Sequence, residues 1–341
     1  MGDKTSIEWT RGEDGSPGAT WNPIVGCSRI SEGCDHCYAI GAVARGAAMG
    51  ASQHVGLTVK PEGGGLDWSG GITVVPHLLD QYWRKRRGRK IFVNSLSDLF
   101  HPDLANRKHA TGRPFVAEII ARMCASPQHT YQVLTKRPQA MAAALAPGSF
   151  LRDCVDVALE DLGVDNCWSP GASRSWPDHI WWGTTIELPK YNWRANYLRL
   201  IDGTRWISAE PLLGDIAESL DLSGIDWLVG GGESGTAARP MHPQWVRNLR
   251  DLVLDQTCPE CGERRPFDQT LSPCSWCNGN GNGPAFFFKQ WGSWSPYYGG
   301  YPAKAQTVVV DDGNDRHCRM WRVGKQKAGR ILDRRTWDEY P

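Results

Sequence analysis

Three cysteines lie close together near the N-terminus of this 341-residue sequence. Cys27, Cys34 and Cys37 belong to the segment TWNPIVGCSRISEGCDHCYA, residues 20–39, which has the composition of one loop followed by a helix. Three thiolates on one loop can hold three irons of a [4Fe–4S] cluster and leave the fourth iron open. The spacing also allows a zinc site completed by a distant His or Cys, or three plain thiols.

Four further cysteines form two C-x-x-C pairs. Cys258 and Cys261 are separated by twelve residues from Cys274 and Cys277. This spacing is typical of a zinc ribbon, in which four thiolates close a tetrahedral Zn²⁺ site and leave no position for catalysis. The pattern predicts an inserted zinc-ribbon-like module at residues 257–283, and an auxiliary iron–sulfur cluster is the alternative.

Polar residues that follow apolar runs form a second set of candidates for chemistry. Converging carboxylates and lysines can hold the ammonium and carboxylate of an amino acid, or shift one another's pKa, although such residues can also form structural ion pairs. The candidate catalytic residues are Glu187, Glu210, Glu233, Asp98 and Lys136. The candidate ligand-binding residues are Asn94, Ser95, Ser208, Gly231, Gly232 and Lys289.

These candidates must be positioned by a series of apolar, β-type runs, each ending in a polar cluster. The runs are Thr20–Val25, Lys90–Ser95, Thr130–Thr135, His179–Thr185, Arg205–Ala209, Asp226–Gly230 and Pro284–Lys289. Near-continuous apolar strands that alternate with helices indicate a parallel sheet buried on both faces. Seven such strands predict an α/β fold with a full or partial (β/α) barrel, whose chemistry lies at the carboxyl ends of the strands.

The segments between the runs complete the expected organisation. Helices are expected at His36–Gly50, Pro76–Arg87, Pro114–Ala125, Pro138–Leu145, Tyr191–Ile201 and Pro243–Gln256. Ala146–Asp178 is expected to be a long connection, and Gln306–Asp311 is expected to pair with Cys318–Val323 as a hairpin. We therefore expect a barrel over residues 1–290 and a small C-terminal extension over residues 291–341.

The composition bounds the location and the partners. Eleven cysteines, seven of them in tight loops, indicate metal ligands in a reducing cytoplasm. The sequence has no apolar run of membrane-spanning length and no signal-peptide pattern, so we expect a cytoplasmic protein with no membrane partner. A net charge of +1 gives no overall attraction to nucleic acid. The basic run RKRRGRK, residues 84–90, could either end a helix or contact phosphate.

The cysteine loop resembles the cluster loop of radical S-adenosylmethionine (radical SAM) enzymes, with C-x6-C-x-His-C in place of C-x3-C-x-aromatic-C. The strings NSLSDLF, LTKRP, SAEPLLG, GGESG-x3-RPM, FFFKQWG and GR-x-LD-x-RTWDEYP extend a resemblance to a phage-borne radical-SAM-like "three-Cys-motif" family of unassigned function. This resemblance runs from Ile7 to Pro341. It implies a partial barrel, a [4Fe–4S] cluster, S-adenosylmethionine on the open iron, His36 against its adenine, and a dedicated protein partner.

Three functions are compatible with these residues. The first is a radical SAM enzyme that cleaves SAM reductively and modifies an unknown substrate, for which the phage-borne relatives and the basic run suggest nucleic acid or a nucleotide. The second is an iron–sulfur and zinc protein that binds nucleic acid without SAM chemistry. The third is a metal-dependent hydrolase, which we place last because the sequence has no HxH or HExxH motif.

Overall fold

The computed structural model describes residues 4–12, 14–82, 84–165, 175–255, 283–297, 305–314 and 316–341. The four cysteines of the expected zinc ribbon, as well as Cys167, lie outside the described residues. The chain divides into two compact units. Unit 1 comprises Met1–Thr184 and Tyr197–Thr204, and unit 2 comprises Thr185–Asn196 and Arg205–Pro341.

Seven strands form the main sheet, in the order β1-β6-β7-β8-β9-β10-β11. Pairing is parallel between β1 and β6, β6 and β7, β7 and β8, β9 and β10, and β10 and β11. The strand order follows the sequence without the reversal that defines a doubly wound sheet. The mixed α/β fold is therefore consistent with the expected partial (β/α) barrel. The strands are β1 (Ala19–Trp21), β6 (Lys90–Val93), β7 (Thr130–Thr135), β8 (Ile180–Thr185), β9 (Arg205–Ala209), β10 (Trp227–Gly231) and β11 (Ala285–Gln290).

Burial explains why these runs form strands. All six residues of β8 and all five residues of β10 are buried. A parallel strand covered on both faces is apolar at consecutive positions rather than at alternate ones, and this is the pattern that the sequence shows. In unit 2, the buried rings of Trp206 and Trp227 lie 5.2 Å apart on neighbouring strands.

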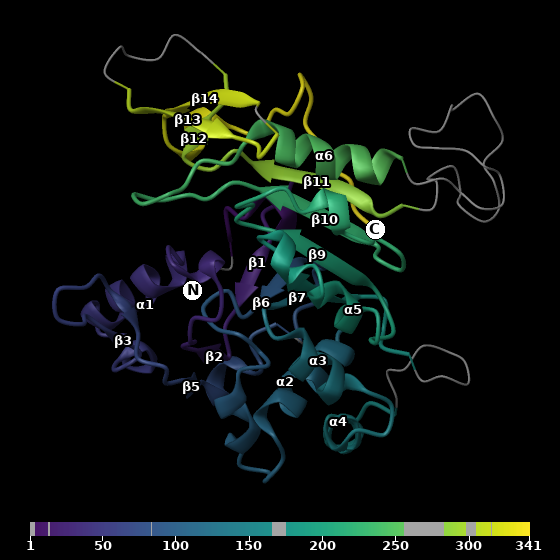
Figure 1. Cartoon of the computed structure of the whole chain (residues 1–341). Helices are drawn as coiled ribbons and strands as arrows, with labels where there is room; N and C mark the ends of the chain where they lie inside the picture. Colours follow the sequence, from purple (N-terminus) through teal and green to yellow (C-terminus); the bar gives the residue numbers. More distant parts are fainter. Residues whose placement is uncertain are drawn as a thin grey trace, which may run out of the picture. The chain divides into compact units, whose positions relative to one another are not determined.

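Helices of unit 1 include α1 (Tyr38–Ala48), α2 (Phe115–Cys124), α3 (Pro138–Leu145) and α4 (Phe150–Asp161), and α4 packs against α2 and α3 (Figure 1). Helix α4, which is not among the helices predicted from the sequence, lies within the long connection expected at Ala146–Asp178. The side chain of Ser149 accepts a hydrogen bond from the Arg152 amide at the start of α4. Such N-caps stabilise a helix by about 1 kcal/mol.

The single strand expected at Thr20–Val25 is also wrong, because the chain leaves the main sheet after Trp21. Pro23 has no N–H to donate to a ladder, and the next two residues form β2 (Ile24–Val25), which pairs antiparallel with β5 (Thr73–Val74). A second small hairpin, β3 (Thr58–Val59) with β4 (Asp67–Trp68), lies between them in sequence.

The helix expected at Pro76–Arg87 is only a 3₁₀ turn at Pro76–Leu78. The carbonyl of Leu78 accepts a hydrogen bond from the indole of Trp21 at 2.7 Å as well as one from the amide of Gln81 at 3.2 Å, so a tertiary contact ties this turn to β1. The helix expected at Tyr191–Ile201 is shorter than predicted, at α5 (Arg194–Leu198).

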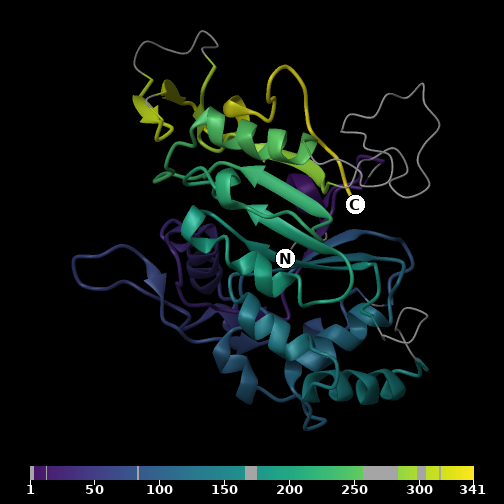
Figure 2. The same cartoon turned by 45° about the vertical axis from the view of Figure 1, so that its right-hand side comes forward.

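In unit 2, helix α6 (Pro243–Leu254) packs against β10 and β11 (Figure 2). The expected C-terminal hairpin is confirmed by β13 (Thr307–Asp311) and β14 (His317–Arg322), which form a three-stranded sheet with β12 (Trp294–Ser295). The last helix is α7 (Lys325–Ala328). Among the described residues, no helix is both long enough and apolar enough to cross a membrane.

Candidate functional site

The cysteine loop begins directly after β2 and is fixed to the loop that follows β6. The amide of Gly26 donates to the carbonyl of Leu96 at 3.1 Å, and the hydroxyl of Ser97 donates to the carbonyl of Ile24 at 2.9 Å. Gly26 has φ +103°, and a Cβ at this position would lie 2.3 Å from the Gly71 carbonyl oxygen. Only glycine fits this approach, so Gly26 lets the start of the cysteine loop lie against the backbone before β5 while its amide binds the loop after β6.

All three cysteines of the loop are free thiols, with Cys34 buried and the other two partly buried. Cys27 and Cys37 pack against one hydrophobic cluster that includes Val25 and Val43. Burial raises the pKa of Cys27 to about 12, although the nearby Arg137 opposes this shift. Burial also raises the pKa of Cys37, which Lys136 opposes. Metal binding at these thiols would therefore release protons.

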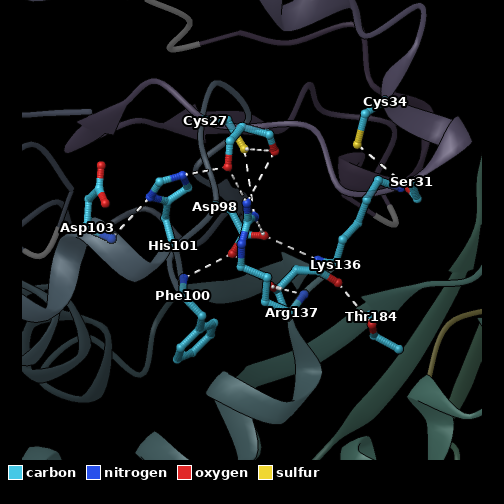
Figure 3. A network of polar contacts seen from close by, with 12 residues as sticks. Cys27, Ser31, Cys34, Asp98, Phe100, His101, Asp103, Lys136, Arg137 and Thr184 are labelled. Atoms are coloured by element: carbon cyan, nitrogen blue, oxygen red, sulfur yellow. Dashed lines mark hydrogen bonds and ion pairs between the residues drawn. The ribbon is translucent and has the colours of Figure 1, made fainter. Parts of the chain in front are cut away.

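Arg137 connects the cysteine loop to the loop after β6 (Figure 3). Its Nη1 lies 2.7 Å from Oδ2 of Asp98 and 3.9 Å from Sγ of Cys27. Its Nη2 donates to the carbonyl of Ser28 at 3.2 Å and to the hydroxyl of Ser28 at 2.9 Å. One guanidinium thus contacts a cysteine sulfur and both oxygens of the following residue.

Asp98 and His101, three positions apart in the sequence, have different side-chain partners. The carboxylate of Asp98 accepts from the amide of Phe100, the hydroxyl of Thr135 and the amide of Lys136, in addition to Arg137. His101 instead contacts the loop of the cysteines. Its Nε2 lies 2.9 Å from the Ser28 hydroxyl, and its Nδ1 accepts from the Asp103 amide. Because Nδ1 accepts, Nε2 carries the proton and donates to Ser28.

Asn94, at the carboxyl end of β6, is a buried side chain whose amide has no internal partner. It is 2% exposed, and neither its Oδ1 nor its Nδ2 has a hydrogen-bond partner among the described residues. Its φ of +63° is uncommon for a residue other than glycine. An unpaired buried amide costs about 1–3 kcal/mol, so this position is a good candidate for ligand contact.

The other candidates of unit 1 surround the cysteine loop less directly. Ser95 donates through its hydroxyl to the side chain of Asn22, and its carbonyl accepts from the hydroxyl of Tyr38. His36 is exposed on the turn between Cys34 and α1. In the part of the chain that the structure describes, no group of three or more His, Cys, Asp or Glu side chains is arranged to hold a metal ion.

Two of the three candidate glutamates of unit 2 are buried and form ion pairs with arginines. Glu187 is fully buried, and its Oε2 lies 2.8 Å from Nη1 of Arg194. Glu233 accepts two hydrogen bonds from the guanidinium of Arg239 and a third from the Arg239 amide. These pairs satisfy the carboxylates within unit 2, so a structural role accounts for both residues.

Glu210 differs because its partners are a lysine and a hydroxyl. Its Oε1 lies 3.1 Å from Nζ of Lys289, and its Oε2 accepts from Ser208 at 3.3 Å. A Cβ on Gly231 would lie 2.6 Å from Oε1 of Glu210, so the glycine makes room for this carboxylate. The candidates Ser208, Glu210, Gly231 and Lys289 therefore form one group.

Gly232 has a different environment from Gly231. A Cβ at this position would lie 2.1 Å from the carbonyl oxygen of Trp291, a backbone atom. The glycine therefore permits the close approach of two chain segments, which is sufficient to explain it without a ligand.

Ser28 and Arg194 are not among the candidates predicted from the sequence. The contact of Arg137 with Cys27 joins residues 110 positions apart, so no local pattern reveals it. The pairing of Glu187 with Arg194 had a signal, since an arginine seven positions after a buried glutamate can return to it through a short turn.

The fold and the two polar groups define a mixed α/β protein with a three-cysteine loop at the edge of a parallel sheet. Residues 4–260 and 264–341 match the family model described as "Protein of unknown function (DUF5131)", and the chain belongs to this family. Searches of curated proteins and of solved structures found no match.

Proposed function

We propose that this protein is a radical SAM-type iron–sulfur enzyme whose cluster is held by Cys27, Cys34 and Cys37. The observation that carries the proposal is the loop itself. Three free thiols stand on one segment between β2 and α1, and the cationic side chains of Lys136 and Arg137 lie beside two of them. Thiolates are the usual ligands of iron–sulfur clusters, and three of them leave one iron open.

The residues present fit such a cluster in donor type and in charge. A cluster with thiolate ligands carries negative charge, and a buried anion requires a nearby cation or hydrogen-bond donors. Arg137 supplies both, because its guanidinium lies 3.9 Å from Sγ of Cys27. The hydrophobic cluster behind Cys27 and Cys37 would shield the metal from water.

The orphaned amide of Asn94 supports a small polar ligand beside the loop. The backbone of residues 94–98 is hydrogen-bonded to residues 21–26, so Asn94 belongs to the segment that carries Asp98. Its amide offers one acceptor and two donors. We propose that these atoms bind polar groups of SAM, whose reductive cleavage at the cluster would supply a 5′-deoxyadenosyl radical.

Glu210 and Lys289 suit a zwitterionic group. The two side chains are 12% and 18% exposed, and they offer opposite charges 3.1 Å apart. A ligand with an ammonium and a carboxylate could exchange with this pair at little electrostatic cost, whereas Glu187 and Glu233 would each lose an arginine partner. Among the three glutamates, Glu210 is therefore our candidate for contact with an amino-acid group.

The test starts with protein reconstituted with iron and sulfide in the absence of oxygen. Iron and sulfide content should fall to background in the triple variant Cys27→Ala, Cys34→Ala, Cys37→Ala, while Cys124→Ala and Cys154→Ala serve as matched controls for buried thiols elsewhere. Equal iron in the triple variant and the wild type would contradict the cluster.

The SAM part of the proposal has its own measurements. After reduction with dithionite, the cluster-replete protein should release 5′-deoxyadenosine, detected by mass spectrometry, and SAM should change the electron paramagnetic resonance signal. Asn94→Ala should weaken this response without loss of iron. A cluster that ignores SAM and yields no 5′-deoxyadenosine would leave only the iron–sulfur assignment.

A nucleic-acid-binding iron–sulfur protein without SAM chemistry is the second candidate, and the basic run favours it. Arg84, Lys85, Arg86 and Arg87 are all exposed, and none of them belongs to a helix in the part of the chain that the structure describes. The run immediately precedes β6, so it lies at the opposite end of this strand from Asn94. Binding of a fluorescent oligonucleotide that weakens steeply with salt and disappears when these four residues become Gln would support this candidate.

A further inference from the structure

We infer that Arg137 is a positioning residue that fixes Cys27 for cluster binding and raises the reduction potential of the cluster. This inference rests on the proposed [4Fe–4S] centre and adds a role that the three thiols alone do not define. It is carried by the contacts of one guanidinium with the cysteine loop (Figure 3).

The contacts of Arg137 control both the sulfur and the backbone next to it. Nη1 lies 3.9 Å from Sγ of Cys27, within the range of a hydrogen bond to sulfur, while Nη2 binds the carbonyl and the hydroxyl of Ser28. The two terminal nitrogens of the planar guanidinium therefore contact two consecutive residues, Cys27 and Ser28. This geometry fixes the direction in which Cys27 projects from the loop.

Asp98 fixes the guanidinium in turn. Its Oδ2 lies 2.7 Å from Nη1 of Arg137, and the two side chains are only 7% and 10% exposed. The hydroxyl of Thr135 and the amide of Phe100 bind the other oxygen of Asp98, so the carboxylate cannot rotate freely. Because Thr135 belongs to β7 and Asp98 to the loop after β6, the arginine is held by two strand ends.

His101 supports the same loop from the other side. Its Nε2 donates to the hydroxyl of Ser28, which also accepts from Nη2 of Arg137. Ser28 is therefore held by two donors from separate parts of unit 1, and the turn directly after Cys27 has little freedom. A preorganised ligand loses less conformational entropy when it binds metal.

The charge of Arg137 has a consequence for electron transfer. A cluster that accepts one electron gains one negative charge, and a fixed positive charge or a hydrogen bond to a ligand sulfur stabilises this reduced state. Lysine would keep the charge, but one ammonium cannot reproduce the two-nitrogen fork. Substitution of Arg137 by Lys or Gln can therefore separate the effect of its charge from the effect of its hydrogen bonds to the loop.

The test compares Arg137→Gln, Arg137→Lys and Asp98→Asn with the wild type after anaerobic reconstitution. Arg122→Gln is the matched control, because Arg122 is also a buried arginine of unit 1 and pairs with Asp80 and Glu118, neither of which belongs to the cysteine loop. Two quantities are measured: the midpoint potential, by titration with dithionite followed by electron paramagnetic resonance, and the rate of iron loss to a chelator.

We expect Arg137→Gln to lower the ratio of reduced to oxidised cluster about tenfold at the wild-type midpoint, equivalent to about 59 mV for one electron. Arg137→Lys should have a midpoint potential close to that of the wild type, because the charge is kept. It should lose iron several-fold faster, because the contacts with Ser28 are gone. Asp98→Asn should also lose iron faster, since it releases the guanidinium. The Arg122 control should match the wild type in both measurements.

The outcomes separate this inference from the proposed function. If the wild type binds no iron, the proposed function fails and the inference with it. If the wild type holds a cluster and Arg137→Gln has the same potential and the same iron loss, the inference alone is overturned. If Arg137→Gln does not fold, Arg137→Lys and Asp98→Asn decide: unchanged iron loss in both would overturn it.

Discussion

The buried pair of Glu187 and Arg194 gives the sharpest prediction about stability. The two side chains are 0% and 2% exposed, and the carboxylate lies 2.8 Å from Nη1. Replacing Glu187 with Gln leaves the guanidinium charged in the interior of unit 2. Removal of one partner from such a pair costs about 3–5 kcal/mol.

Two remaining contacts place the expected cost near the lower end of that range. Nη1 of Arg194 also donates to the carbonyl of Thr185 at 2.8 Å, and the guanidinium lies 4.1 Å from the centre of the Tyr191 ring. Both contacts survive the substitution and continue to stabilise the charge. We therefore expect Glu187→Gln to lower the free energy of unfolding by about 3 kcal/mol.

The assay is urea denaturation followed by tryptophan fluorescence, with the iron content of the folded protein measured in parallel. Glu210→Gln is the control, since its pair with Lys289 is partly exposed and should contribute about 1 kcal/mol. A double variant with Met at positions 187 and 194 should recover most of the loss, because two apolar residues leave no buried charge. Substitutions that disturb no structural feature change stability by less than about 0.5 kcal/mol. A loss within that range in Glu187→Gln would refute the structural role and favour the catalytic one.

Two further predictions concern packing and pH. Gly232→Ala should strongly destabilise unit 2, because its Cβ would lie 2.1 Å from the carbonyl oxygen of Trp291. Gly235→Ala is the control and should cost less stability, because no atom lies within 4 Å of its Cβ although φ is +118°. Equal thermal stability of the two variants would contradict the steric argument. Burial raises the pKa of Glu118, but hydrogen bonds from Arg122, Arg113 and Thr111 outweigh this effect, so its net pKa is lowered. The stabilisation is therefore complete above the unfolded value of 4.5 and is lost as the pH falls further. The difference in unfolding free energy between the wild type and Glu118→Gln should shrink below that pH, and a constant difference down to pH 2–3, roughly a full unit below ordinary carboxyl pKa values, would contradict it.

The parallel strands could be predicted from the sequence because their burial leaves an unbroken apolar run. Trp227–Gly231 and Ile180–Thr185 contain only buried residues, and their short length together with their aromatic and β-branched residues distinguishes them from a buried helix such as α2. The prediction was wrong where a tertiary contact or a proline decided the outcome. The indole of Trp21 donates to the Leu78 carbonyl from 57 residues away, and Pro23 ends a strand that the apolar pattern continues through.

Helix α4 could have been predicted from its sequence, although it lies within a segment that was interpreted as a long connection. Gly148 and Ser149 mark a helix start, and Val155, Ala158 and Leu159 have helical spacing and are buried. The cysteine loop was evident from spacing, but its environment was not. The contacts of Ser28 with His101 and Arg137 span 73 and 109 residues, so only the folded chain brings these side chains together.

The distance in sequence between Cys27 and Arg137 also has a meaning during synthesis. The ribosome makes Arg137 110 residues after Cys27, which takes roughly 5–20 s at typical rates of elongation. Throughout that interval the three thiols exist without the arginine, and for its first part they also exist without the carboxylate of Asp98. The nascent loop therefore emerges in a state with open, unclamped cysteines. Metal that is inserted after β7 has left the ribosome would meet cysteines already held by Arg137.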